Sequence, residues 1–258
     1  MINFNTAIVR RPAKSVCKGL RAGDGDDPDI NGVAAEHDAY VDALQAAGLA
    51  VTVLEPLEAF PDSIFVEDPA LVFSNFAVLL RPGAPSRRDE PAKLAPALRA
   101  HFDQVVELDA GHADGGDILQ TPQGVMIGLS ARTDKAGAAA LQKVLADRDV
   151  ESAIVETPAG VLHFKSDCAL LDEETVLSTL RLAASNLFSK FQTLLTPDGD
   201  EGAANALRIN DVVFLGEEFP RTIDLVAGAG FNVVPLPTKE IAKIDAGLSC
   251  MSLRWLTP

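Results

Sequence analysis

Cys250 lies eight residues before the C-terminus, between the small-residue step GLS and the apolar run MSLRW. Free cysteine is among the most buried residue types, so a small buried hydrophobe is the ordinary interpretation of such a position. A thiolate is also a nucleophile that attacks electrophilic carbon. The groups that accompany Cys250 must therefore decide between an inert and a reactive thiol.

Groups that could assist a nucleophile stand just ahead of other apolar runs. His163 lies in LHFKSD, and acids lie in PDSIFVED, DGGD and DAGLSC. Singly, each has an ordinary explanation, because Asp beside Gly commonly forms turns and a lone histidine in an apolar alternation fits a core strand. Together they would let a thiolate attack carbon while an imidazole transfers protons and carboxylates orient it or bind a cation. His112 is the rival imidazole and ranks second, whereas His37 and His101 lie on helical stretches rich in solvated residues.

The charge around such a thiol predicts the kind of ligand. Nearby carboxylates oppose thiolate formation and should raise the pKa of Cys250, until a cation beside the sulfur reverses the effect. A planar guanidinium, with its fork of N–H donors, satisfies several carboxylates at once. Arg87, Arg88 and Arg132 lie in the loops RPGAPSRRDE and LSARTD, and one of them could bind an anionic group. Arginine and its derivatives carry both a guanidinium at one end and a carboxylate at the other.

The elements that must position these groups alternate between helix and strand. Apolar residues recur at helical spacing over residues 33–47, 92–102, 138–145 and 223–229, and each stretch is followed by a β-branched run. This alternation predicts an α/β fold. Small, polar or acidic residues also precede apolar runs at intervals of 49, 50, 38 and 45 residues, at Asp68, Asp117, Asp167, Asn205 and Cys250. That period indicates stacked or radially arranged units whose loops face one mouth, unless it reflects only the strand spacing of any α/β protein.

Composition limits the class of protein and its partners. The 258 residues are 47% hydrophobic and 23% charged, which is typical of a globular chain of one large domain or two small ones. The net charge of −15 repels nucleic acid and anionic lipid. Three cysteines at no metal-ligand spacing argue against a disulfide framework and against zinc, and favour a reducing compartment. Neither a signal peptide nor a membrane span is expected, so the predicted location is cytoplasmic.

The motifs FVED, RPGAPSRR, DGGD, GLSART, LHFKS and the terminal LSC together resemble the dimethylarginine dimethylaminohydrolases of the guanidino-modifying amidinotransferase superfamily. The resemblance runs from about Asp62 to Cys250. It implies a single domain over residues 1–258, built as a five-bladed α/β propeller of pseudo-fivefold ββαβ repeats. It implies neither a metal nor an organic cofactor, and it is compatible with a homodimer, although no interface can be identified in the sequence.

Carried over position by position, the resemblance implies three catalytic residues. Cys250 would be the nucleophile, His163 the general acid and base, and Asp114 the acid that holds both the histidine and the guanidinium. Many bacterial relatives have Glu at the position of Asp114. The implied substrate contacts are Glu67 and Asp68 for the guanidinium nitrogens, Arg87 and Arg132 for the carboxylate, Asp62 for the α-amino group, and Phe65, Asp245 and the backbone near Leu20 for the rest of the pocket.

The implied reaction converts Nω-methylated arginine to citrulline and a methylamine through a thiouronium on Cys250. The family's lid loop should fall near CKGLRAGDGDDPD, where glycines supply backbone freedom. Three alternatives remain open at this point. One is a related hydrolase acting on arginine, citrulline or another guanidino or ureido amino acid, one is a non-catalytic binding protein of the same fold, and one treats all these residues as structural.

Overall fold

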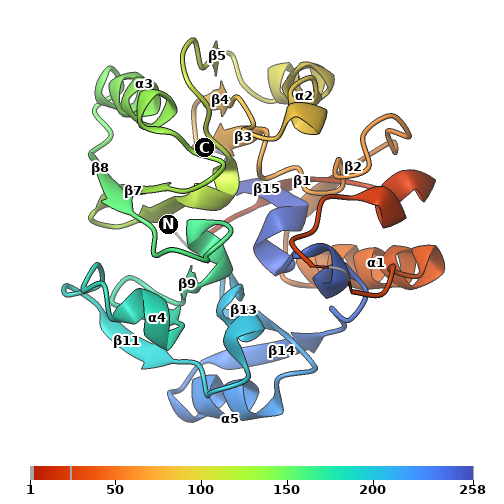
Figure 1. Cartoon of the computed structure of the whole chain (residues 1–258), viewed down its shortest axis with the longest axis vertical. Helices are drawn as coiled ribbons and strands as arrows, with labels where there is room; N and C mark the ends of the chain where they lie inside the picture. Colours follow the sequence, from red (N-terminus) through yellow and green to blue (C-terminus); the bar gives the residue numbers. More distant parts are fainter. Residues whose placement is uncertain (1–2, 24, 258) are drawn as a thin grey trace.

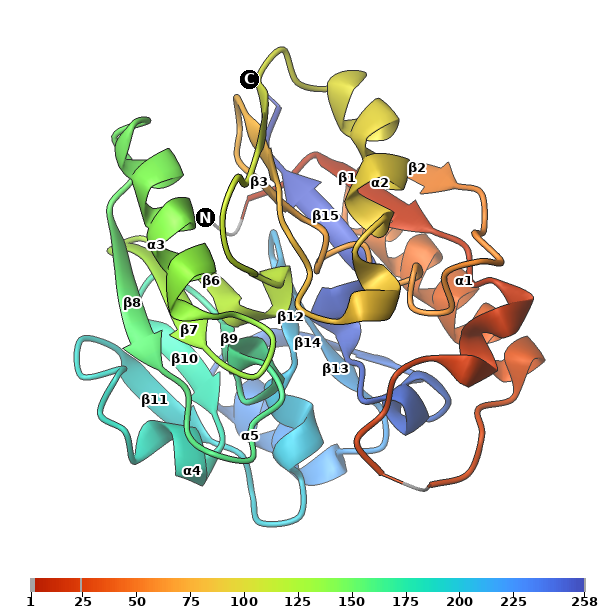
Figure 2. The ribbon, with the colours of Figure 1, turned by 45° about the horizontal axis from the view of Figure 1, so that its top comes forward.

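Five three-stranded sheets surround a central axis in the computed structural model, which describes residues 3–23 and 25–257. Figure 1 looks down this axis, and Figure 2 tilts the ring by 45°. The sheets are β3 (Ala70–Val72), β4 (Ala77–Leu79) and β5 (Val105–Glu107); β6 (Ile118–Thr121), β7 (Gly124–Leu129) and β8 (Ser152–Glu156); β9 (Cys168–Leu170), β10 (Thr175–Ser178) and β11 (Gln192–Leu195); β12 (Leu207–Ile209), β13 (Val212–Gly216) and β14 (Asn232–Leu236); and β15 (Ser252–Trp255), β1 (Thr6–Arg10) and β2 (Ala50–Leu54).

Every sheet has the same connectivity. Its first strand pairs antiparallel with the second, and the second pairs parallel with the third. A helix joins the second strand to the third, as a parallel pair requires. These helices are α1 (Ile30–Ala46), α2 (Glu90–Arg99), α3 (Lys135–Ala146), α4 (Leu180–Ala183) and α5 (Pro220–Gly228), and they lie toward the outside of the ring (Figure 1). The five-bladed α/β propeller of ββαβ units is confirmed.

The ring is closed by strands from opposite ends of the chain. β15 is the first strand of the fifth blade and pairs antiparallel with β1 in a register that opposes Thr6 to Trp255 and Val9 to Ser252. Inside this blade the Tyr40 hydroxyl of α1 is hydrogen-bonded to the Ser252 hydroxyl. Pairing with β1 therefore fixes β15 and, with it, the residues just before β15 that include Cys250.

The predicted repeat positions all lie one or two residues before a first strand, at β3, β6, β9, β12 and β15. At three of them the side chain also fixes the next blade. Asp68 accepts a hydrogen bond from the backbone of Gly116 at 3.1 Å, Asp117 from Phe164 at 2.8 Å, and Asn205 from Ser249 at 3.1 Å. The recurring polar residue thus satisfies a backbone donor that the turn before the strand leaves unpaired. Asp167 differs, because it bonds Thr179 and Arg181 of its own blade.

Four of the five helices agree with the predicted helical stretches within a few residues. The exception is α4, whose four residues are too short for a helical period to be recognised. Helix α1 begins at an Asp29 cap that accepts from the backbone of Asn31 and Gly32, and its buried face includes His37. His37 is 1% exposed, so its expected place on a solvated face was wrong. Within the described ranges, no helix is both long and apolar enough to cross a membrane.

Candidate active site

A small cleft of about 40 Å³ opens where the blades' first strands begin, and Cys250 is in its wall. The short 3-10 helices η3 (Gly115–Asp117), η4 (Phe164–Ser166) and η7 (Leu248–Met251) lie just before the first strands of three blades and surround this region. Of the eleven residues predicted for the site, nine line the cleft: Leu20, Asp62, Phe65, Asp68, Arg87, Arg132, His163, Asp245 and Cys250. Asp114 and Glu67 do not.

His163 is held by an acid that is itself held in place. Its Nε2 lies 3.1 Å from Oδ2 of Asp114, and the other oxygen, Oδ1, accepts from the backbone of Gly83 at 2.8 Å. Asp114 is fully buried, so it meets the imidazole and not the cleft. The expectation that Asp114 holds the histidine agrees with this geometry, and the expected contact of Asp114 with a guanidinium stays a prediction.

The surroundings of His163 favour its protonated form. Burial alone would lower the pKa of His163, but the charge of Asp68, the hydrogen bond to Asp114 and the charges of Asp117 and Asp114 raise it to about 9. The imidazole therefore carries a proton at neutral pH and has an N–H to donate. A protonated general acid beside a cleft can protonate a departing amine.

The thiol of Cys250 is correspondingly kept neutral. Burial, followed by the charges of Glu67 and Asp68, raises the pKa of Cys250 to about 11. The predicted direction was right, although burial contributes more than the carboxylates on which the prediction relied. A cation placed beside the sulfur would oppose both carboxylate contributions and lower the pKa again.

Asp68 and Arg87 form a buried ion pair at the cleft wall. Arg87 Nη1 bonds Asp68, its Nε and Nη2 bond Glu90, and Nη2 also donates to the backbone oxygens of Asp62 and Phe65 at 3.1 and 3.0 Å. Burial alone would raise the pKa of Asp68, but the Arg87 and His163 charges lower it, so the carboxylate is ionised. Arg87 lines the cleft as predicted, yet its donors already serve protein acceptors. Arg87 therefore orients Asp68, and its expected role as a ligand of the substrate carboxylate stays a prediction.

Arg132 is the cation at this cleft whose guanidinium has no hydrogen-bond or ion-pair partner among residues 3–23 and 25–257. Its backbone N–H donates to the Ser130 hydroxyl at 2.9 Å, which places the residue, and its side chain is half-buried. Gly83 lies against this loop so closely that an added Cβ would come 2.4 Å from the Arg132 carbonyl oxygen. Arg132 thus fits the predicted anionic end of a ligand better than Arg87 does.

Glu67 faces away from the cleft. Its carboxylate accepts from Lys165 at 2.6 Å, from Arg254 at 3.0 Å and from the Ser249 hydroxyl at 3.1 Å. These contacts engage both oxygens, and the predicted bond from Glu67 to a guanidinium stays a prediction. Its charge still reaches the sulfur, since it helps to raise the pKa of Cys250.

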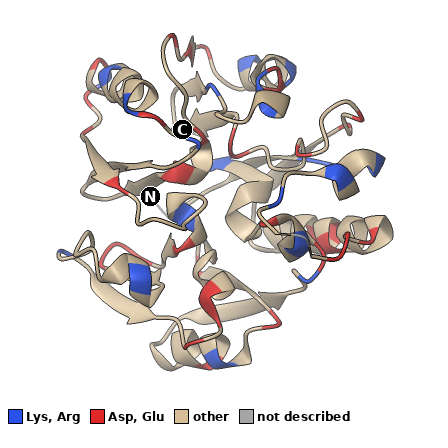
Figure 3. Ribbon diagram, in the orientation of Figure 1, with Lys and Arg blue, Asp and Glu red and all other residues tan. Residues whose placement is uncertain are grey.

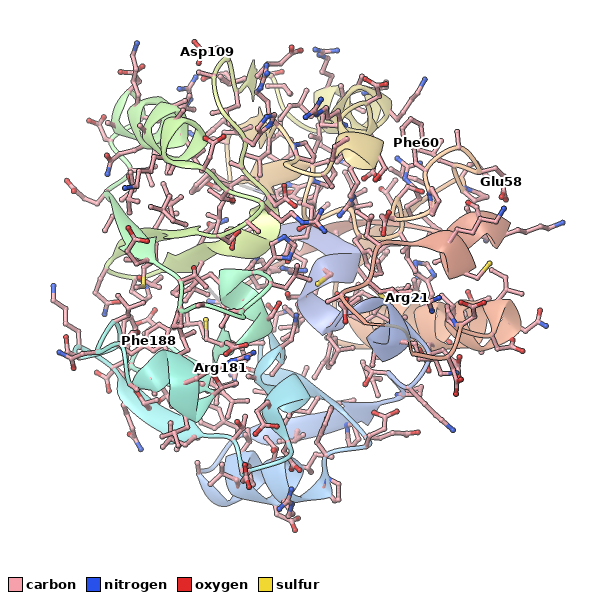
Figure 4. The ribbon with its side chains drawn as sticks, viewed as in Figure 1. Arg21, Glu58, Phe60, Asp109, Arg181 and Phe188 are labelled. Atoms are coloured by element: carbon pink, nitrogen blue, oxygen red, sulfur yellow. The ribbon has the colours of Figure 1, made fainter. Side chains whose placement is uncertain are left out.

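The predicted lid segment is tied to the cleft by two acids of the pocket. Asp62 accepts from the backbone of Leu20 at 2.8 Å, and Asp245 accepts from the backbone of Ala22. Arg21 between them pairs with Asp27 at 2.6 Å and is marked in Figure 4. Asp62 and Asp245 therefore hold the main chain of residues 20–22 beside the pocket that they line.

Asn205 is a contact of the thiol to which sequence reasoning gave no role. Its Nδ2 lies 3.7 Å from Sγ of Cys250, while its Oδ1 accepts from the backbone of Ser249. The repeat spacing had marked this position, and the occurrence of an amide where three other blades carry an aspartate was the signal that could have revealed it.

A bound cation would have to compete with groups already present. One atom each of Asp68, Asp114 and His163 lie within 4.8 Å of one another, which is close enough for a shared metal ligand set. Asp68 is paired with Arg87, however, and the pKa of His163 near 9 means that a metal must displace a proton at neutral pH. The donor set therefore suits an organic cation near Asp68 better than a metal ion.

Comparison with known proteins points to one enzyme family. The family model described as N,N dimethylarginine dimethylhydrolase, eukaryotic, matches residues 23–165. The N(G),N(G)-dimethylarginine dimethylaminohydrolase of Pseudomonas aeruginosa is 35% identical over 254 residues, covering 98% of this chain and 100% of the relative. A cysteine-to-serine mutant of the Pseudomonas aeruginosa enzyme, in complex with citrulline, superimposes with a TM-score of 0.94 over 97% of this chain and 99% of that one. A histidine-to-glycine dimethylarginine dimethylaminohydrolase in an adduct with S-methyl-L-thiocitrulline, 35% identical, gives the same TM-score and coverage.

Proposed function

The chain belongs to the dimethylarginine dimethylaminohydrolase family, and we propose that it hydrolyses Nω-methylated arginines to citrulline and a methylamine. One observation carries the proposal: a thiol with a raised pKa and a protonated imidazole with a raised pKa share a cleft with an ionised aspartate. In this combination the thiol is protonated without a ligand, and a cation such as a guanidinium lowers the pKa of the thiol so that the thiolate can form. Asymmetric dimethylarginine and monomethylarginine are the substrates proposed.

Asp68 and Arg132 supply complementary ends for such a substrate. The guanidinium binds beside Asp68 next to Cys250, the α-carboxylate binds Arg132, and Asp62 with Asp245 receives the α-amino group near the backbone of Leu20. Phe65 covers the aliphatic stem. Support comes from the joint presence of these side chains in one cleft and from the absence of a protein partner for the Arg132 guanidinium within the described part of the chain.

The reaction proceeds in two halves. The guanidinium charge lowers the pKa of Cys250, the thiol loses its proton to water, and the thiolate forms a C–S bond with the guanidinium carbon. His163 then gives its proton to the methylated nitrogen, the C–N bond breaks, and the methylamine leaves a thiouronium on sulfur. Neutral His163 next takes a proton from water, and the resulting hydroxide attacks the thiouronium carbon. The C–S bond then breaks while the hydroxyl proton passes to the sulfur, which releases citrulline and restores the thiol.

A side-by-side turnover assay tests this proposal against a related superfamily activity. Dimethylarginine, monomethylarginine, arginine and citrulline are supplied separately to the wild-type protein and to the matched variants Cys250→Ser and Cys168→Ser. We expect turnover of the methylated arginines by wild type and by Cys168→Ser, and no turnover by Cys250→Ser. Preferred turnover of arginine or citrulline would assign the chain to the alternative activity, and undiminished turnover by Cys250→Ser would overturn the mechanism.

The setting of the enzyme is part of the same proposal. We infer a small-molecule substrate and no nucleic-acid or membrane partner, on the ground that a net charge of −15 repels polyanions. Acidic and basic residues both occur over the whole ring in Figure 3, including its centre. The three cysteines are free thiols, which supports a reducing, cytoplasmic location. The proposed mechanism needs no cofactor, because the thiol and the imidazole supply the nucleophile and the proton transfers. A homodimer is the proposed assembly by family resemblance, and the whole chain is proposed to act as one domain.

A further inference from the structure

A second and much larger cavity, of about 510 Å³, lies behind the active site. The first strands of the blades begin at the cleft with Cys250 and run away from it. Residues of β3, β6, β9, β12 and β15 line the second cavity, so it lies among the same central strands on the side away from the cleft. Cys250, His163 and Arg132 are not part of its wall.

An ionic partition separates the two spaces. Glu67 and Ser249 line the large cavity and are bonded to one another, and the neighbouring residues Asp68 and Cys250 line the cleft. Lys165 and Arg254 both pair with Glu67 from this side and are about one-eighth exposed, at 13% and 12%. The large cavity therefore ends on charged groups that lie directly behind the nucleophile.

The charge of this wall is positive in a strongly negative chain. Five charged side chains line the cavity, and the two acids, Glu67 and Glu173, are outnumbered by the three cations Lys165, Arg208 and Arg254. Lys165 carries three N–H donors, and one of them meets Glu67. Within residues 3–23 and 25–257 its other donors have no hydrogen-bond partner. A desolvated ammonium with unused donors favours an anionic acceptor.

Most of the remaining wall is apolar. Leu71, Leu119, Leu170, Leu207 and Trp255 come from the five first strands, one from each. A cavity of several hundred Å³ with mostly apolar walls and a few convergent polar groups is the usual form of a small-molecule site. The apolar walls exclude a compact inorganic anion as the best match and favour a ligand with a hydrocarbon body.

We propose that this cavity is a binding site for a small carboxylate with an apolar tail, whose carboxylate binds Lys165 and Arg254 and whose tail lies among the five first strands. A medium-chain fatty acid has this chemistry. The assignment of this cavity as a binding site is independent of the proposed function. The effect of the bound ligand on turnover rests on the proposed function.

A ligand in the second cavity would affect the ionisation of Cys250 through Glu67. A bound carboxylate competes with Glu67 for Lys165 and adds a negative charge behind the sulfur. The charge of Glu67 already raises the pKa of Cys250, and that of Lys165 lowers it. The ligand therefore makes the thiolate harder to form, and inhibits turnover without occupying the substrate cleft.

Trp255 makes occupancy directly visible, because it is the single tryptophan of the chain and lines this cavity. We expect 8-bromooctanoate to quench its fluorescence saturably, since a bromine in contact with an indole quenches it. The uncharged 8-bromooctanol and the cationic 8-bromooctylammonium are matched controls that should quench weakly and without saturation. Equal quenching by all three, or none by the carboxylate, would overturn the site. Cys250→Ser should bind the probe normally, so binding is measured apart from any turnover.

Variants and kinetics complete the test. Lys165→Gln should weaken 8-bromooctanoate binding by about tenfold or more, the loss expected when a charge-assisted hydrogen bond is removed. Lys93→Gln, at an exposed lysine of α2, is the matched control and should bind as wild type. Octanoate should lower kcat for dimethylarginine and leave KM nearly unchanged. Purely competitive inhibition, or unchanged binding by a folded Lys165→Gln, would place the probe elsewhere and refute the proposal.

Discussion

The side-chain amide of Asn205 lies between the nucleophile and its supporting turn. Its nitrogen is 3.7 Å from Sγ of Cys250, and its oxygen accepts the backbone N–H of Ser249 at 3.1 Å. One planar group thus contacts the sulfur and fixes the 3-10 helix that carries it. Gly247 packs against the same amide so tightly that a Cβ there would come 2.3 Å from its Cγ.

Asn205 should act as a positioning residue for the thiol. Asn205→Asp keeps an acceptor for Ser249 but replaces the donor near sulfur with a negative charge, so the pKa of Cys250 should rise further and turnover should fall at least tenfold. Asn205→Ala removes both contacts. The rate of Cys250 alkylation as a function of pH measures the thiol pKa in each variant. If the thiol pKa and the turnover of Asn205→Asp equal those of wild type, the contact between Asn205 and the sulfur does not contribute to function.

The nucleophile should be identifiable by trapping. In His163→Gly no imidazole is available to activate water, so S-methylthiocitrulline should leave a covalent adduct that mass spectrometry locates on Cys250 after acid quench. Cys168 is the internal control, because burial strongly raises the pKa of its thiol and it is 1% exposed. An adduct on Cys168 would transfer the nucleophilic role to that residue.

The pH dependence of kcat/KM should show the charge on His163. The pKa of His163 near 9 predicts that kcat/KM falls as pH rises through 9, because the imidazole loses the proton it must donate. Asp114→Asn removes a hydrogen bond and a charge that raise this pKa, so the falling limb should move to lower pH. Asp109→Asn, an exposed acid at the edge of the ring (Figure 4), should leave it in place. An unmoved limb in Asp114→Asn would separate Asp114 from the general acid.

Much of this site could be predicted from the sequence, because the repeat places the reactive side chains at the same position in each blade, just before its first strand. Cys250, Asp68 and the turn before β9 that holds His163 all lie where a first strand begins, and a ring brings such points together. Pairing between blades was harder to foresee. Arg87 and Arg132 look alike in the sequence, and only the buried Glu90 and Asp68 decide that Arg87 is already occupied. Glu67 likewise turns to Lys165, almost a hundred residues later in the chain. Such contacts depend on tertiary neighbours that periodicity does not specify.

His37 should make the folded protein sensitive to acid. Burial is the main cause that lowers the pKa of His37 to about 4, against 6.5 in the unfolded chain. The unfolded chain therefore binds the proton first, and stability decreases as pH falls from about 6.5 toward 4. The expected loss at pH 4.5 is about 2–3 kcal/mol. Urea unfolding at pH 7 and 4.5 measures it, and His37→Leu should lose this share of the pH dependence. His101→Leu, at an exposed histidine, should retain it.

The two arginines of the cleft should separate binding from stability. Arg132→Gln removes a half-buried cation without a described ion-pair partner, so KM should rise about tenfold, from the loss of a charge-assisted hydrogen bond, while the urea midpoint barely changes. Arg87→Gln strands the buried carboxylates of Asp68 and Glu90, which typically costs about 3–5 kcal/mol of unfolding free energy. Denaturant titration and steady-state kinetics on both variants make the comparison. If Arg87→Gln raises KM and leaves stability intact while Arg132→Gln does the reverse, the two residues have been assigned the wrong way round, and the substrate carboxylate must bind at the Asp68 side of the cleft.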